Sequence, residues 1–206
     1  MTCSLTDSGR HLVEWYVDRV RSGTASPNRY YLEDNGGFVL LGEGNHRVVY
    51  GQSLSAEGTD DAVFSDQDCV VKLAKFDDPW ANRNEIINHE FAPDGVAQFL
   101  APVHEWADDG QWLLMDRAKM GVSPSERDWI EEEIQARGYQ LDDIRTDNMG
   151  YIDGNPYIVD YGFRLIKSGT DLPEEYRDGK PEHVGPPGEE FFEPSISEKQ
   201  MAELFG

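Results

Sequence analysis

The stretch Leu141-Asp142-Asp143-Ile144-Arg145-Thr146-Asp147-Asn148 decides the expected fold, together with Asp160-Tyr161-Gly162, which begins twelve residues after Asn148. The residues between them predict a hairpin that turns at Asp153-Gly154-Asn155. Asparagine and aspartate at two strand ends can supply the oxygen ligands that Mg²⁺ prefers, while a separate carboxylate accepts a hydroxyl proton. Taken singly, each of these residues is equally typical of a turn.

A glycine turn lies further upstream. Gly42 and Gly44 stand between two β-rich segments, where backbone N–H groups can approach an anion without interference from a Cβ atom. A turn of this kind is more often an ordinary hairpin turn. The predicted strand that follows it also excludes the dinucleotide-binding fingerprint, which needs a helix directly after the glycines.

Lys72 interrupts an apolar segment that predicts a strand, Cys69 to Ala74. A lysine in such a strand commonly points to solvent from the edge of a sheet. The alternative is a partly buried ammonium that reaches phosphate oxygens and is held by a carboxylate. Glu85, on a predicted helix over 82–92, is then the nearest partner, and Glu90 is the second candidate.

In chain order these segments resemble the protein-kinase-like family, whose signature comprises a Gly-rich loop, a strand lysine, a helix glutamate, a catalytic loop and Asp-Phe-Gly. The resemblance runs from Phe38 to Gly162, about 60% of the chain. It implies ATP and Mg²⁺ as cofactors. The residues that it assigns are Asp143, Lys72 and Arg145 for catalysis, Gly42, Gly44, Arg47, Lys72, Glu85 and Met115 for nucleotide binding, and Asn148 and Asp160 for the metal.

The chain departs from the family pattern in several places. Arg47 stands where the third loop glycine would be, so the loop is expected to be stiffer or to lend a cation to the nucleotide. Leu141 and Asp142 replace the His and Arg before the catalytic aspartate, and only forty-four residues follow Gly162. The resemblance therefore implies an α+β fold with an N-terminal antiparallel sheet lobe, one helix and a much reduced C-terminal lobe. In this respect the chain looks like the minimal kinase-like proteins of some tailed viruses and prokaryotes.

Local patterns predict four regions of the chain. An amphipathic helix and a linker occupy 1–29, and the sheet lobe occupies 30–118, with its last residues joining the lobes where an adenine ring would lie. The reduced lobe covers 119–167 and includes a helix that begins at the capping box Ser123-Pro124-Ser125-Glu126 and has Trp129, Ile130 and Ile134 on its apolar side. An acidic tail rich in Pro and Gly, with a short terminal helix, covers 168–206.

Composition limits the function classes. The net charge of −22 argues against a broad basic face for nucleic acid, and it fits either a salt-rich cytoplasm or a basic partner. Cys3 and Cys69, the two cysteines, are expected to be reduced thiols. No apolar run reaches the roughly 18 residues of a membrane span, so no membrane is expected, and the expected location is the cytoplasm, with association with a virion as the alternative.

Two function classes besides catalysis stay open. The first expectation is a Mg-ATP-dependent phosphotransferase whose acceptor is unknown, with Asp143 orienting the acceptor hydroxyl. The alternatives are a nucleotide-binding pseudokinase and an acidic structural or partner-binding protein, such as a component of a larger viral or halophilic assembly. Their basis is the altered sequence around Asp143 and the acidic tail with Phe191-Phe192.

Overall fold

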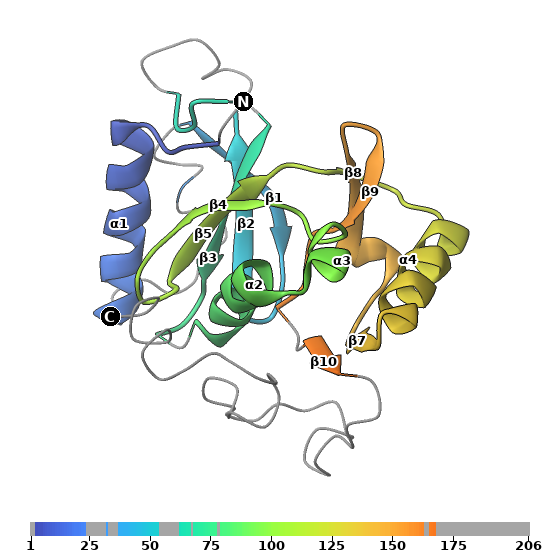
Figure 1. Cartoon of the computed structure of the whole chain (residues 1–206). Helices are drawn as coiled ribbons and strands as arrows, with labels where there is room; N and C mark the ends of the chain where they lie inside the picture. Colours follow the sequence, from blue (N-terminus) through green and yellow to red (C-terminus); the bar gives the residue numbers. More distant parts are fainter. Residues whose placement is uncertain are drawn as a thin grey trace.

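The computed structural model describes residues 3–23, 32, 37–53, 62–66, 68–77, 79–162 and 165–167 of the 206-residue chain. The expected acidic tail and its terminal helix lie outside these residues. Within the described part the chain is α+β, with antiparallel strand pairing in each sheet and few helices (Figure 1). None of the described helices is both long enough and apolar enough to cross a bilayer.

A five-stranded antiparallel sheet forms the centre of the N-terminal part. Its strands, in spatial order, are β1 (Phe38–Glu43), β2 (Arg47–Gln52), β3 (Cys69–Ala74), β5 (Trp112–Asp116) and β4 (Val103–Trp106). Lys72 pairs with Val49 on one side and with Leu113 on the other. It therefore lies on the central strand, and the alternative of an edge-strand lysine pointing to solvent is wrong.

Helix α1 (Asp7–Arg21) covers one face of this sheet (Figure 1). Successive strand residues point to opposite faces, so Val71 and Leu73 of β3 pack with α1, whereas Val70 packs on the other face. The helix itself buries one stripe, which includes Val13 and Tyr16, as its periodicity predicted. Because α1 shares a core with the sheet, the described N-terminal part contains α1 in addition to the helix expected within the sheet lobe.

The opposite face of the sheet carries α2 (Trp80–Phe91), where 82–92 was expected to be helical, and the short α3 (Asp94–Ala97). Ile86 of α2 lies in the same core as Met115 of β5. The predicted hairpin before the lobe junction consists of β4 and β5, although its first strand begins at Val103 rather than Phe99. Gly110 takes a φ of 79° at its turn, a backbone conformation that favours glycine.

The remaining elements follow the sheet along the chain and lie beside it (Figure 1). They are β6 (Lys119–Met120), α4 (Pro124–Ala136), β7 (Tyr139–Leu141), a 3₁₀ turn (Thr146–Asn148), β8 (Met149–Ile152), β9 (Asn155–Ile158) and β10 (Leu165–Lys167). Strands β8 and β9 form the predicted hairpin, and β10 pairs with β7, a contact that the sequence did not predict.

Helix α4 begins and ends where its sequence predicts. The Ser123 side chain accepts from the backbone N–H of Glu126, and the Glu126 carboxylate accepts from the backbone N–H of Ser123. Gly138 follows the helix with a φ of 83°. Ile130 and Ile134 are buried, whereas Trp129 is 47% exposed and meets the buried Phe99 edge-on, so it lies at the margin of the apolar side rather than within it.

Cys3 and Cys69 form a disulfide, so the expectation of two reduced thiols was wrong. The expectation treated Cys3 as part of a loose terminus. In the structure Leu5 forms a β-bridge with Phe64, which fixes the segment before α1 against the sheet and buries Cys3. A separation of 66 residues along the chain gave no sign of this proximity.

The antiparallel sheet with α2 on one face is compatible with the sheet lobe of a kinase-like fold. The reduction of the second lobe and the four region boundaries stay predictions.

Candidate functional site

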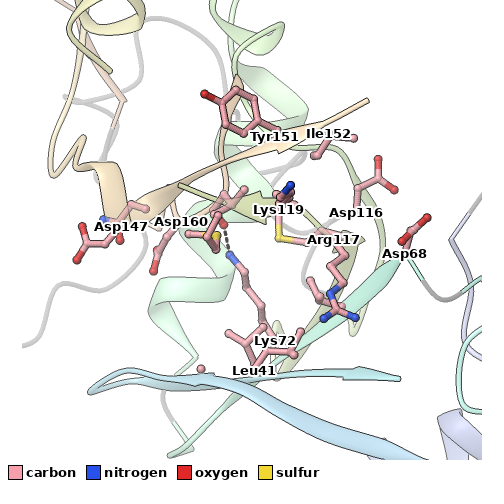
Figure 2. A pocket seen from close by; sticks show the side chains of 18 of the residues that line it. Leu41, Asp68, Lys72, Asp116, Arg117, Lys119, Asp147, Tyr151, Ile152 and Asp160 are labelled. Atoms are coloured by element: carbon pink, nitrogen blue, oxygen red, sulfur yellow. Dashed lines mark hydrogen bonds between the residues drawn. The ribbon is translucent and has the colours of Figure 1, made fainter. Parts of the chain in front are cut away.

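A cavity of about 1070 Å³ opens between the five-stranded sheet and the β8–β9 hairpin (Figure 2). This volume is sufficient for a ligand of nucleotide size, since small-molecule pockets span roughly 300–1,000 Å³. Most of the residues singled out in the sequence line it, namely Gly42, Gly44, Arg47, Lys72, Met115, Arg145, Asn148 and Asp160. Glu85 and Asp143 lie behind its wall and contact residues that line it.

One part of the cavity wall is apolar. Leu41 and Val49 from the sheet and Ile152 from the hairpin belong to it, and Figure 2 shows Leu41 and Ile152 on opposite sides. Met115, buried at the end of β5, also lines it. Opposed apolar side chains around a slot suit a flat ring system, because burial of both ring faces removes apolar surface from water.

Lys72 and Glu85 form a buried ion pair. Lys72 Nζ lies 2.7 Å from Glu85 Oε1, and the two side chains are 5% and 0% exposed. The ammonium also donates to the backbone carbonyl of Val159, and Figure 2 shows it reaching from the sheet toward Asp160. Of the two candidate partners of Lys72, Glu85 is therefore the one that binds it. Glu90 lies instead beside His89, with 3.9 Å between Glu90 Oε1 and His89 Nε2. Burial, and next the charge of Arg47, lower the pKa of Lys72.

Arg47 joins this pair instead of projecting freely into the cavity. Its Nη1 donates to Glu85 Oε2 and, at 3.3 Å, to Asn82 Oδ1, and its Nη2 donates to Asp160 Oδ1. Burial opposes the charged guanidinium, but the two carboxylates outweigh it and raise the pKa of Arg47. Arg47, Lys72, Glu85 and Asp160 thus form one cluster of two cations and two carboxylates, which we call the charge cluster.

Asp160 is the member of the charge cluster that remains most accessible, with 42% of its side chain exposed. Burial alone would raise the pKa of its carboxyl group, but the charges of Arg47 and Lys72 outweigh burial and lower it. Asn148 lies beside it, because the Asn148 carbonyl accepts from the backbone N–H groups of Val159 and Asp160. The structure thus brings together the two residues expected to hold a metal.

Helix α2 holds the Asp160-Tyr161-Gly162 segment through asparagines that the sequence reasoning missed. Asn88 Nδ2 donates to the Tyr161 carbonyl at 2.7 Å, and Asn84 Nδ2 donates to the Gly162 carbonyl at 3.1 Å. A Cβ atom at Gly162 would lie 2.8 Å from the Ala81 carbonyl oxygen, so only glycine allows this approach. One sequence pattern could have indicated these contacts. The polar residues Asn82, Glu85 and Asn88 recur every third residue on the buried side of α2, which is otherwise apolar.

The stretch that resembles a catalytic loop is internally bonded. Asn148 Nδ2 donates to the carbonyl of Asp143 at 3.0 Å and to its Oδ2 at 3.1 Å. Arg145 Nε lies 3.1 Å from Asp143 Oδ1 and 3.3 Å from Asp147 Oδ1. Asp143 has a φ of 62°, which is strained for a residue with a Cβ atom. Its carboxylate therefore lies next to the cavity, bonded to two residues of the cavity wall.

The glycine turn is tight and lies over the cavity. Gly44 N donates to the Arg47 carbonyl at 2.9 Å, which closes the turn between β1 and β2. A Cβ atom at Gly42 would meet no protein atom within 4 Å. The backbone at Gly42 is thus open to a ligand, while Arg47 leaves the turn and points toward α2.

Magnesium does not fit this site as the counter-charge of Asp160. The ion binds through one or two carboxylates in addition to waters and phosphates, and Asp160 and Asn148 offer the right donor types. Asp160 Oδ1, however, already accepts from Arg47. Two unit positive charges 4 Å apart repel by roughly 4 kcal/mol at an effective dielectric constant of about 20, so a cation beside Asp160 is opposed by the guanidinium.

Comparisons with known proteins give a distant likeness. No family model matches the chain, and no curated protein matches it. Among solved structures, one described as a co-crystal structure of WbdD and the kinase inhibitor LY294002 is similar to this chain at 13% identity with a TM-score of 0.41. The alignment covers 61% of this chain and 32% of that one, so the aligned part is about a third of that chain's length.

Proposed function

We propose that the cavity binds ATP and that the chain is a phosphotransferase of the kinase-like type. The observation that carries this proposal is the buried Lys72–Glu85 pair at the cavity wall. Burying an ammonium is costly unless it is paired, and a strand lysine held by a helix carboxylate at a cavity is a costly arrangement for stability alone. It is well suited to present a fixed positive charge to phosphate oxygens.

The apolar and the polar residues of the cavity wall suit different parts of a nucleotide. The apolar slot that includes Leu41, Met115 and Ile152 would take the base, and Lys72 and the open backbone at Gly42 would take the phosphates. Catalysis of phosphoryl transfer depends mainly on positioning and charge stabilisation, which a rigid set of this kind supplies.

The transfer step would involve Asp143 and Arg145. The acceptor hydroxyl oxygen would bond to the γ-phosphorus, the bond from that phosphorus to the β–γ bridging oxygen would break, and ADP would leave. The hydroxyl proton would pass to Asp143, and Arg145 would face the transferred group from the cavity wall. The acceptor is left unassigned.

The test is a calorimetric titration of the full chain with ATP, with and without Mg²⁺. Lys72→Met is expected to weaken binding by about tenfold or more, which corresponds to roughly 1.4 kcal/mol. The matched control is Arg127→Met, which removes a surface cation on α4 that pairs with Glu131. Equal affinity in all three proteins, or no binding to a folded wild-type chain, would contradict the proposal. Release of ADP in the presence of candidate acceptors, compared with Asp143→Asn, then tests the transfer step.

A further inference from the structure

Arg47 occupies the position at which a cation would meet Asp160. It is the first residue of β2, and it is only 6% exposed even though it lines the cavity. Its guanidinium bridges a carboxylate from α2 and a carboxylate that follows β9. A single side chain at the cavity wall therefore connects the sheet, helix α2 and the segment that follows the β8–β9 hairpin.

The charges of the charge cluster balance without any added ion. Arg47 and Lys72 carry two positive charges, and Glu85 and Asp160 carry two negative charges, so the formal sum is zero. In a phosphate site that depends on a metal, the ion neutralises the carboxylate that would otherwise repel the phosphate oxygens. Here a guanidinium already neutralises that carboxylate from the protein side.

From this geometry we propose that Arg47 takes the place of a divalent cation at Asp160, so that the site binds nucleoside triphosphate without a metal ion. The inference rests on the proposed function and concerns the binding of the nucleotide. In this role Arg47 acts on the ligand indirectly, because it neutralises the carboxylate of Asp160.

The surroundings of Arg47 oppose its displacement by a metal. Within the described part of the chain its guanidinium bonds to the side chains of Asn82, Glu85 and Asp160, and the last two are charged. Loss of Asp160 as a partner would leave part of a buried charge without compensation. The backbone encloses it as well, because a Cβ atom at Gly162 would lie 3.1 Å from Arg47 Nη2.

The experiment measures the affinity of the full chain for ATP by calorimetry in two buffers, one with EDTA and one with excess MgCl₂. For the wild-type chain we expect the two dissociation constants to agree within about threefold, well under the tenfold that corresponds to 1.4 kcal/mol. For Arg47→Gln we expect binding in EDTA to be weaker by about tenfold or more, and to recover in part when Mg²⁺ is added. Arg127→Gln on α4 is the control and should behave as the wild type.

The possible outcomes separate the two proposals. Tight binding by the wild-type chain only in Mg²⁺ would overturn the role of Arg47 and leave the proposed function in place. Absence of binding to the folded chain in both buffers would overturn both. Metal-independent binding that Arg47→Gln does not weaken would also overturn the role of Arg47. If Arg47→Gln does not fold, Arg47→Lys keeps the charge, and the wild-type comparison between the two buffers still decides the question.

Discussion

Arg47, at the start of β2, donates to the carboxylate of Asp160, which follows β9 and lies 113 residues further along the chain. This contact links the glycine turn over the cavity to the segment that resembles Asp-Phe-Gly. Since Arg47 also binds Glu85, the partner of Lys72, a change at any of these four side chains alters the charge balance around the other three.

Glu85→Gln should lower the free energy of unfolding strongly. The substitution keeps the shape of the side chain but removes the charge of Glu85 from beside two buried cations, which leaves Asp160 as the one carboxylate of the charge cluster. Breaking a buried ion pair by removing one partner costs about 3–5 kcal/mol. Urea denaturation followed by circular dichroism measures the change. Glu90→Gln, at an exposed position on the same helix, is the control and should stay within about 0.5 kcal/mol of the wild type. Similar losses in both variants would contradict the assignment of Glu85.

Gly162→Ala should destabilise the chain through overpacking. The added methyl group would lie 2.8 Å from the Ala81 carbonyl oxygen, a backbone atom of α2 that cannot move aside easily. Inserting a methyl group into a well-packed site typically costs about 1–3 kcal/mol. Gly42→Ala is the matched control, because a Cβ atom there meets nothing within 4 Å. A denaturation midpoint that moves equally in both variants would argue against the close approach of α2 to Gly162.

Asp160 should give the chain a specific sensitivity to acid. Its folded pKa lies below its unfolded value of about 3.9, so its contribution to stability is fully present above that value. The contribution is lost as the pH falls through the folded pKa. We therefore expect the stability gap between wild type and Asp160→Asn to be largest well above a pH of about 3.9, the unfolded pKa, and to shrink as the pH falls below it.

The measurement is urea denaturation at a series of pH values. Asp18→Asn serves as the control, since the Asp18 side chain on α1 is 78% exposed and lies 3.9 Å from Arg21. Its stability gap should be small at every pH. A gap for Asp160→Asn that does not change with pH would show that the Arg47 contact is not an ion pair in solution.

Reduction of the Cys3–Cys69 disulfide should also destabilise the fold. A bond between residues 66 positions apart restricts the unfolded chain, and disulfides typically contribute about 2–4 kcal/mol in this way. Denaturation with and without dithiothreitol measures the loss. The double variant Cys3→Ser/Cys69→Ser should match the reduced protein and should not respond to reductant. Equal stability of the wild type in both conditions would contradict the disulfide.

Local signals predicted much of the fold. The capping box at Ser123, the apolar run of β3 and the helical period of α1 each depend on residues within one element, so a single sequence displays them. The Lys72–Glu85 pair was also within reach, because Glu85 follows Lys72 by only thirteen residues and lies on the helix that comes next along the chain.

Contacts between distant segments were not predictable in the same way. The disulfide and the Arg47–Asp160 contact span 66 and 113 residues, and no local pattern records which distant segment packs against which. Arg47 was expected to be a loop residue near the nucleotide, because its position in the glycine turn can be read from the neighbouring residues alone. Its partners are set by the docking of α2 and of the β8–β9 hairpin, which depends on the whole chain.

The charge cluster has a consequence for how the protein is made. Synthesis starts at the N-terminus, so Arg47, Lys72 and Glu85 leave the ribosome before Asp160. At about 5–20 residues per second, the chain between Glu85 and Asp160 takes roughly 4–15 s to appear. During that interval the nascent sheet holds two cations against one carboxylate. We therefore expect the N-terminal part to stay loosely folded on the ribosome and to consolidate when the β8–β9 hairpin and Asp160 emerge.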